Sequence, residues 1–304
     1  MSSTSPSAIA LLNIQQDVQT RIDRKLALFI DQQTQTADEL ITAMKYSVFS
    51  GGKRMRPMLL SIVGNMLDAN PDDLDVASMS IECIHAYSLI HDDLPAMDDD
   101  ALRRGKPTNH IQFGEATAIL AGDALQTLAF EIVLNHPLSK DNLAKRVDMA
   151  RVIAKASGVN GMCAGQSIDL LATGNEISLA ELTELHQLKT GALLSACVSL
   201  GAILAPSIPN EHIQLLQKYA SKIGLAFQVQ DDILDVISDS ETLGKPQGSD
   251  ADLNKNTFVS HLGLEGSQSF LQMLHNEALQ AIASLPYNTD QLKAFTDFLV
   301  SREY

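Results

Sequence analysis

The stretch HDDLPAMDDD, residues 91–100, places five aspartates within nine positions at the end of an apolar helical pattern over residues 73–94. Pro95 has no backbone N–H and disfavours helical backbone at Leu94, so the sequence predicts that the helix ends or kinks there. A helix C-terminus carries partial negative charge, which makes aspartates there unfavourable for stability. Neighbouring carboxylates also raise one another's pKa unless a cation lies among them. The stretch is therefore either a solvated loop or a site that holds cations.

The helical pattern extends over most of the chain. Apolar residues recur at intervals of three and four, and no stretch of comparable length alternates with period two. Turn-forming sequences separate the segments, as at 50–52, 70–73 and 244–248. The predicted helices cover residues 11–32, 36–49, 55–68, 73–94, 115–135, 141–157, 178–205, 209–237, 266–284 and 288–301. We expect an all-α fold, an antiparallel bundle of about ten helices forming one domain over residues 1–304.

Composition agrees with a helical core and limits the partners. Of 304 residues, 45% are apolar, only 5% are aromatic and none is Trp, which favours helices over sheets. The 22 basic and 37 acidic residues give a net charge of −15. This charge disfavours nucleic acid and anionic membrane surfaces as partners. An anionic substrate would need a local basic patch.

No feature of the sequence predicts export or membrane insertion. The three cysteines, at positions 83, 163 and 197, give no disulfide framework and are expected to be small core residues in a reducing cytoplasm. The N-terminal segment lacks the basic region of a signal peptide. The longest apolar run, 193–205, is shorter than the roughly 20 residues of a membrane span. We therefore expect a cytoplasmic protein without a membrane span.

A second acidic cluster, DDILD at 231–235, ends another predicted helix. Its spacing puts Asp231 and Asp235 on one helical face. An aromatic residue precedes the aspartate pair in both clusters, Tyr87 in the first and Phe227 in the second, so the two helices could face each other across a cavity. Facing carboxylates can bind Mg²⁺ together with waters and substrate phosphates. Either cluster alone also fits a solvated helix end, but two together favour a metal site.

Basic residues lie near both clusters. GGKRMRP at 51–57 follows a glycine turn and begins a helix, whose N-terminal amides favour anions. Arg103, Arg104 and Lys106 directly follow the first acidic cluster. Arginine binds phosphate oxygens in pairs, whereas lysine acts as a point charge. Each patch alone could be ordinary surface charge, but in an acidic protein their combination favours a diphosphate site.

Three weaker signals point to the same cavity. In GQSIDL, residues 165–170, Gln166 and Asp169 share one helical face, although an ordinary polar stripe would look the same. KTG at 189–191 interrupts a helix rich in Leu and Ala, and a kink there would expose backbone carbonyl dipoles beside a developing carbocation. His85 lies two helical turns before the first aspartates, on nearly the same face. The alternative for His85 is a hydrogen-bonded core histidine.

Taken together and in order, these segments resemble the trans-isoprenyl diphosphate synthases, and closely the bacterial farnesyl diphosphate synthases. The resemblance runs from about residue 40 to 265 through GGKRMRP, HAYSLIHDDLPAMDDDALRRGKPT, FGEATAILAGDALQ, GMCAGQSIDL, LKTGAL and FQVQDDILDV followed by GKPQGSD. It implies the isoprenoid synthase fold, with a deep central cavity, in a homodimer. It also implies a prenyltransferase that condenses isopentenyl diphosphate with dimethylallyl and geranyl diphosphate, by ionisation, condensation and elimination, to give farnesyl diphosphate.

The resemblance also implies roles for individual residues. Mg²⁺, three ions with substrate bound, would be held by Asp92, Asp93, Asp98, Asp231, Asp232 and Asp235. Isopentenyl diphosphate would bind Gly52, Lys53, Arg56, His85 and Arg104. The allylic diphosphate would bind Arg103, Gln166, Asp169, Lys189, Thr190, Gln228 and Lys245. The catalytic residues would be Asp92, Lys189, Thr190, Gln228 and Asp231.

Product length would depend on Tyr87 and Ser88. Tyr87 lies five residues before the first aspartate pair, about 7.5 Å deeper along a helix. In the family, a bulky aromatic here combined with the longer motif DDLPAMD accompanies a fifteen-carbon product. The sequence departs from many relatives at its C-terminus, Arg302-Glu303-Tyr304, which lacks their basic tail, and at Ser249 and Phe258, which leaves the role of Lys255 open.

Three alternatives remain. A geranylgeranyl or geranyl diphosphate synthase would share every motif and differ in the cavity floor. His91-Asp92 also spells the metal-binding pair of HD-type phosphohydrolases, but the further histidine ligands of that class have no matching pattern here. A non-catalytic synthase subunit predicts a damaged aspartate motif, and both motifs are intact.

Overall fold

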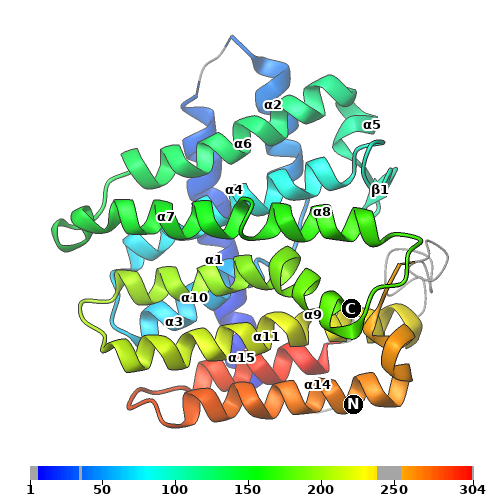
Figure 1. Cartoon of the computed structure of the whole chain (residues 1–304). Coiled ribbons are helices and arrows are strands. Elements are labelled where there is room, and N and C mark those ends of the chain that lie inside the picture. Colours follow the sequence, from blue (N-terminus) through cyan, green and yellow to red (C-terminus); the bar gives the residue numbers. More distant parts are fainter. Residues whose placement is uncertain (1–5, 34–35, 238–254, 303–304) are drawn as a thin grey trace.

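The structure is a computed structural model that describes residues 6–33, 36–237 and 255–302 (Figure 1). The described chain is almost entirely helical, which confirms the predicted all-α class. The strands found in this part are the two residues of β1, Leu102–Arg103, and of β2, Lys106–Pro107. The helices are α1 Pro6–Asp31, α2 Asp38–Val48, α3 Met55–Met66, α4 Pro71–Asp92, α5 Asn109–Phe113, α6 Glu115–Asn135, η1 Lys140–Lys145, α7 Arg146–Ser157, α8 Met162–Ala172, α9 Leu179–His186, η2 Gln187–Gly191, α10 Ala192–Leu204, α11 Asn210–Ile237, α14 Phe258–Ala283 and α15 Asp290–Ser301.

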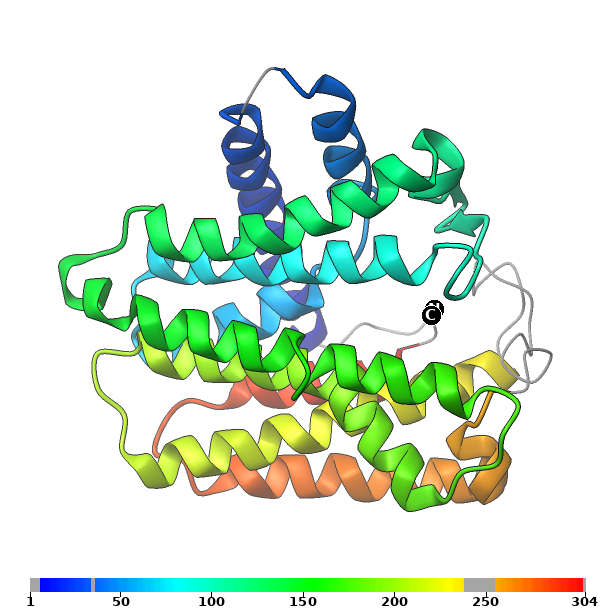
Figure 2. The same ribbon diagram turned by 45° about the horizontal axis from the view of Figure 1, so that its top comes forward.

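The long helices run side by side, and α1 crosses them steeply (Figures 1 and 2). α4 packs between α3 and α6, α10 contacts α3, α7 and α11, and α11 packs along α14. The C-terminal ends of α4, α8 and α11 meet at one end of the bundle, on the right in both figures. This arrangement brings both acidic clusters to the same end of the molecule.

α4 is buried on nearly all sides, and its buried residues include the acidic Asp73, Asp75 and Glu82. Asn70 caps its first turn and Pro71 occupies the first helical position, where its missing N–H costs nothing. The buried carboxylate of Asp75 accepts from Arg21 of α1 at 2.8 Å, and that of Asp73 accepts from Asn142 at 2.6 Å. Each buried charge therefore has a partner, which is the condition for leaving it in a core.

Helix boundaries differ from the prediction where glycine or serine weakens the apolar pattern. α8 was absent from the predicted helices, and Gly161 and Gly165 at its start explain why. The predicted helix 178–205 is interrupted by a π-helical turn, Gln187–Gly191, at the expected position of the KTG break. α14 begins eight residues earlier than predicted, at a capping box formed by Thr257 and Ser260, and bends at Gly263.

Two described helical stretches have the length and apolar composition of a membrane span: Glu115–Asn135 and Leu179–Leu204. In their most apolar windows, 44% and 56% of the residues are buried inside the protein. Both stretches contribute to the helical core, which accounts for their composition.

Candidate active site

The first acidic motif folds back on itself after α4. The amide of Asp98 donates to the carbonyl oxygen of Asp92 at 2.9 Å, and the amide of Met97 donates to that of Leu94 at 2.8 Å. Asp99 adopts a left-handed backbone, φ 53°, where the loop turns away. The longer motif DDLPAMD therefore returns Asp98 to the side of Asp92, although six positions separate them.

Each carboxylate of this motif pairs with a basic side chain. The Nε of Arg103 donates to both carboxylate oxygens of Asp93, at 2.8 and 2.9 Å. Lys255 lies 3.4 Å from Asp98, which gives this lysine a contact that the sequence left open. Asp92 lies 4.0 Å from the Nζ of Lys189. The carboxylates of the motif are therefore paired with basic side chains, and the motif is not a solvated acidic loop.

Lys189 links α8 to the first motif. Its Nζ donates to Asp169 at 2.6 Å, as well as facing Asp92. Burial lowers the pKa of Lys189, but the carboxylates of Asp92 and Asp169 more than offset this and the pKa is raised. Burial also raises the pKa of Asp92, which Lys189 opposes and the adjacent Asp98 reinforces. Lys189 therefore remains a cation beside a crowded pair of carboxylates.

Two glycines let neighbouring helices pack against the π-helical turn that carries Lys189. A Cβ on Gly165 of α8 would lie 2.2 Å from the Lys189 amide nitrogen, and one on Gly224 of α11 would lie 2.8 Å from the Cα of Gly191. No side chain fits at either distance. The turn is thus held between α8 and α11, and π-helical turns of this kind are frequent at functional sites.

The same turn joins the second acidic cluster through Thr190. Its hydroxyl donates to the Oε1 of Gln228 at 3.3 Å, and the Nε2 of Gln228 donates to Asp232 at 3.0 Å. Asp232 also accepts from the backbone amide of Phe258 at 2.7 Å, at the start of α14. Thr190 and Gln228, both predicted to bind the allylic diphosphate, are therefore in direct contact with each other.

The three aspartates of the second cluster differ in position. Asp231 lies on the wall of a cavity and pairs with Arg302 at 2.7 Å. Asp232 and Asp235 are buried. Arg302 also stacks on the ring of Phe227, 3.9 Å from its centre. No role was predicted for Arg302, because a single arginine belongs to no sequence pattern.

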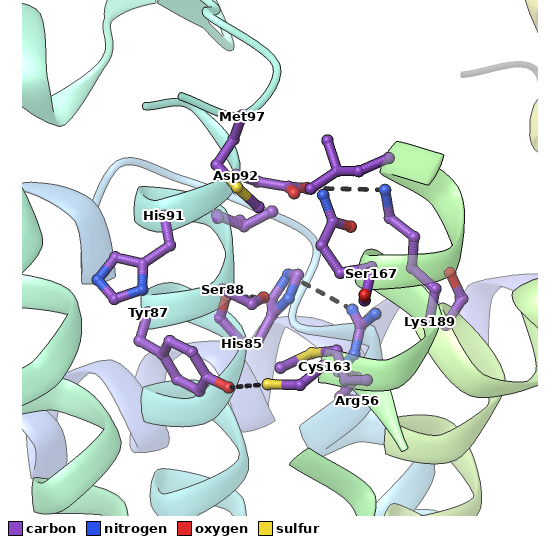
Figure 3. A pocket seen from close by; sticks show the side chains of 15 residues that line it. Arg56, His85, Tyr87, Ser88, His91, Asp92, Met97, Cys163, Ser167 and Lys189 are labelled. Carbon is purple, nitrogen blue, oxygen red and sulfur yellow. Dashed lines mark hydrogen bonds and ion pairs between the residues drawn. The ribbon is translucent and has the colours of Figure 1, made fainter. Parts of the chain in front are cut away.

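A cavity of about 370 Å³ lies between α4, α8 and the π-helical turn (Figure 3). Asp92 and Lys189 lie at one end, and Tyr87 lies at the other. The Tyr87 ring is 5% exposed, and its hydroxyl is 3.6 Å from the Sγ of Cys163 on α8. Ser88 lines the cavity beside Tyr87. Cys163 is exposed to this cavity, so its predicted place in the core was wrong.

A second cavity of about 720 Å³ adjoins the first, because Arg56, His85, Leu89 and Thr190 line both. All five residues predicted to bind isopentenyl diphosphate line it, as do the ends of several other basic side chains. Its charged lining consists of Lys53, Arg54, Arg56, Arg103, Arg104 and Arg302 against Glu82 and Asp231. This cavity is therefore cationic, in a chain whose net charge is −15.

A two-residue hairpin loop holds one side of the cationic cavity. β1 and β2 pair through Arg103 and Lys106, and the loop residues Arg104 and Gly105 both have positive φ, as a type I′ turn requires. Arg104 reaches the carbonyl oxygen of Gly51. A Cβ on Gly52, φ 122°, would lie 2.7 Å from the Arg104 guanidinium, so glycine is needed for this approach.

Burial and neighbouring cations lower the pKa values of two side chains in the cationic cavity. Burial, then Arg302 and Arg104, lowers the pKa of Lys53. Burial and the adjacent Arg56 lower the pKa of His85 well below its usual value, so His85 is neutral at pH 7. The Nη1 of Arg56 lies 3.4 Å from the Nε2 of His85, and arginine can only donate. The contact therefore suits the His85 tautomer in which Nε2 is the acceptor.

Of the remaining predicted residues, Gln166 and His91 lie in the part of the chain that the structure describes. Gln166 lines the first cavity, and its Nε2 is buried without a hydrogen-bond partner among the residues described. Lys245 and Ser249 lie outside the described residues. His91 contacts the carbonyl oxygen of Ile119 through Nε2 at 3.1 Å and packs on Gly122 of α6. His91, the histidine of the pair that HD-type phosphohydrolases share, therefore packs α4 against α6.

The donor set fits Mg²⁺ bound jointly with a phosphorylated ligand. Within residues 6–33, 36–237 and 255–302 no group of three or more His, Cys, Asp or Glu side chains could hold an ion by itself. Mg²⁺ typically uses one or two carboxylates and completes its octahedron with waters and substrate phosphates. Asp92 and Asp98, adjacent to each other at the cavity mouth, supply such a pair.

Comparisons with known proteins agree with one another. The family model described as Polyprenyl synthetase matches residues 37–292. The chain is 49% identical over 289 residues to the farnesyl diphosphate synthase of Haemophilus influenzae, covering 95% of this chain and 97% of that protein. An FPP/GFPP synthase structure from Zymomonas mobilis has a TM-score of 0.85 at 37% identity, covering 96% of this chain and 99% of that one. A geranyltransferase from Helicobacter pylori, complexed with magnesium and isoprenyl diphosphate, has a TM-score of 0.81 at 34% identity, covering 99% and 98%.

Proposed function

This chain belongs to the polyprenyl synthetase family and is a prenyltransferase, and from that premise we propose that it makes farnesyl diphosphate. The substrates are isopentenyl diphosphate and the allylic dimethylallyl and geranyl diphosphates. The observation that carries the proposal is the pair of adjoining cavities, one closed by Tyr87 and the other lined by cations. Two diphosphate substrates of different tail length fit such a pair.

The allylic diphosphate binds at the mouth of the first cavity. Lys189 and Arg103 neutralise its charge, and the residues that would hold Mg²⁺ are Asp92, Asp93, Asp98, Asp231, Asp232 and Asp235. Gln166 and Asp169 form the polar wall, and Lys245 completes the set of cations. The bound metal supplies charge stabilisation for the diphosphate as the allylic C1–O bond breaks. The Helicobacter pylori relative, whose structure contains magnesium and isoprenyl diphosphate, supports this assignment.

Isopentenyl diphosphate binds the cationic cavity. Lys53, Arg56 and Arg104 provide ammonium and guanidinium donors, and Gly52 lets the backbone approach the phosphates. Neutral His85 accepts from Arg56 and so orients that guanidinium, 3.4 Å away. The shared lining residues of the two cavities keep the two substrates adjacent. Such positioning can supply about 7–11 kcal/mol of the rate acceleration.

The reaction has three steps: ionisation, condensation and elimination. The allylic C1–O bond breaks, and its electron pair leaves with the diphosphate. The isopentenyl double bond then forms a C–C bond to the allylic cation, and loss of a proton to the released diphosphate forms the new double bond. Thr190 and Gln228 direct oxygen atoms at the cation, from a π-helical turn whose carbonyl dipoles add to the effect.

Tyr87 and Ser88 limit the product to fifteen carbons. Tyr87 blocks the end of the first cavity opposite Asp92, which supports a short product. A geranylgeranyl diphosphate synthase, the alternative with the same motifs, would need a longer cavity. We further propose one functional domain over the whole chain, a homodimeric cytoplasmic enzyme and three Mg²⁺ ions with substrate bound.

The test measures the ratio of diphosphate released to isopentenyl diphosphate consumed. Purified protein with Mg²⁺, geranyl diphosphate and isopentenyl diphosphate should release one diphosphate for each isopentenyl unit consumed, and a chelator should abolish the release. Release of inorganic phosphate without consumption of isopentenyl diphosphate would instead favour the phosphohydrolase. No reaction under any of these conditions, from a folded protein, would favour the non-catalytic subunit.

A further inference from the structure

Arg54 stands between the two basic residues of GGKRMRP that the function uses, yet its own backbone is strained. Its φ of 46° and ψ of 39° lie in the left-handed region, at the position that begins α3. A residue with a Cβ adopts this conformation at a cost in free energy. The side chain is only 7% exposed. Contacts of the side chain must therefore compensate for the strain.

The guanidinium of Arg54 is satisfied in three directions. Its Nε donates to Asp23 of α1 at 2.8 Å, its Nη1 donates to Glu82 of α4 at 2.6 Å, and its Nη2 donates to the carbonyl oxygen of Val48, the last residue of α2, at 2.6 Å. One rigid planar group thus joins three helices behind the loop. Lysine, with a single ammonium, cannot reproduce this geometry.

These contacts fix the loop that presents the cationic residues. Lys53 directly precedes Arg54, and Arg56 follows in the first turn of α3. The carbonyl oxygen of Lys53 accepts from Gln15 of α1 at 2.7 Å, which holds the same loop from a second side. The direction of the Lys53 and Arg56 side chains therefore depends on the backbone conformation that Arg54 maintains.

Arg54 also neutralises the charge of Glu82. This glutamate lines the cationic cavity, where an unpaired carboxylate would repel a diphosphate. Its Oε2 lies 2.6 Å from the Nη1 of Arg54, so the pair contributes little net charge to the cavity wall. The buried position of both side chains makes the pairing persistent.

We propose that Arg54 is a positioning residue for the homoallylic diphosphate, the diphosphate of isopentenyl diphosphate. It holds Lys53 and Arg56 in place and neutralises Glu82, because its guanidinium nitrogens already donate to Asp23, Glu82 and Val48. The inference rests on the proposed function, because it takes the cationic cavity as the isopentenyl diphosphate site. The allylic site at Asp92 and Lys189 shares no contact with the Arg54 guanidinium.

The test compares Michaelis constants for the two substrates. Arg54→Lys keeps the positive charge but loses the planar guanidinium with its three contacts. Asp23→Asn weakens only the contact of that guanidinium with α1, at a carboxylate that is 31% exposed. Each should raise KM for isopentenyl diphosphate by roughly tenfold, the effect of one lost charge-assisted hydrogen bond, and leave KM for geranyl diphosphate unchanged. Asp75→Asn is the matched control, because Asp75 also joins α4 to α1, through Arg21 at 2.8 Å. It should lower thermal stability without changing either KM.

Equal increases in both Michaelis constants, or the same change in the Asp75→Asn control, would show a general structural role and overturn the proposal. Unchanged constants in folded Asp23→Asn would do the same, even if Arg54→Lys does not fold. Calorimetric titration with inorganic pyrophosphate measures the cationic cavity without turnover. Arg54→Lys and Asp23→Asn should each weaken pyrophosphate binding even if the proposed reaction fails, and unchanged pyrophosphate affinity contradicts the positioning role.

Discussion

Replacing Tyr87 by alanine should lengthen the product. Tyr87 lines the cavity at the end opposite Asp92, five residues or about 7.5 Å deeper along α4, where we propose that its ring forms the floor. Its removal opens the floor toward α8, where Cys163 faces the tyrosine hydroxyl at 3.6 Å. We expect geranylgeranyl diphosphate, one five-carbon unit longer, to become a major product.

The same change should cost stability. The ring is 5% exposed, so its loss leaves an internal cavity. Truncation of a buried aromatic residue to alanine typically costs about 3–5 kcal/mol. In a protein of this size, each kcal/mol lowers the melting temperature by about 2–4 °C. Product analysis must therefore be made well below the lowered melting temperature.

Chromatography of dephosphorylated products from labelled isopentenyl diphosphate measures the outcome. Tyr87→Phe is the matched control, because it keeps the ring and removes only the hydroxyl contact to Cys163. The control should keep the product of the unaltered protein. If folded Tyr87→Ala also keeps that product, Tyr87 does not form the floor, and the chain-length argument is refuted.

Further variants test the metal, the buried histidine and the C-terminal arginine. Asp92→Asn and Asp231→Asn should each lower kcat about a thousandfold, equivalent to several kcal/mol of charge stabilisation, with circular dichroism unchanged; near-normal turnover would contradict the metal assignment. Burial lowers the pKa of His186 from 6.5 to about 4, so the unfolded chain binds more protons between these values and stability falls, by about 3 kcal/mol, as the pH drops through this window. Thermal melts should show this slope and lose part of it in His186→Phe; an identical slope in both proteins rejects the assignment. Arg302→Ala removes the partner 2.7 Å from Asp231, so half-maximal activity should need less Mg²⁺, and a higher requirement would count against competition between the arginine and the metal.

The fold could be predicted from the sequence wherever apolar periodicity was continuous. α4, α6 and α11 were predicted within about two residues of their ends, because capping residues and prolines mark those ends. α8 was not among the predicted helix ranges, although Gln166 and Asp169 were assigned to one helical face, because Gly165 interrupts its apolar pattern. Gly165 is present for close approach to Lys189, a tertiary requirement that no local pattern reveals.

The site could be predicted as a set of residue types, but its pairings could not. The sequence indicated carboxylates near cations, yet the bidentate contact of Arg103 with Asp93 depends on the hairpin loop at Arg104 and Gly105. Arg54 was passed over for a related reason. Its spacing is that of a surface charge, and only the packing of α1, α2 and α4 shows that it faces inward.

The most direct test of the account is the identity of the prenyl chain. Labelled isopentenyl diphosphate, supplied with dimethylallyl diphosphate and Mg²⁺, should be converted through geranyl diphosphate to farnesyl diphosphate, which accumulates as the end product. Accumulation of a geranyl or geranylgeranyl chain would contradict the role of the Tyr87 floor. Absence of any elongated chain, with release of inorganic phosphate, would contradict the account as a whole.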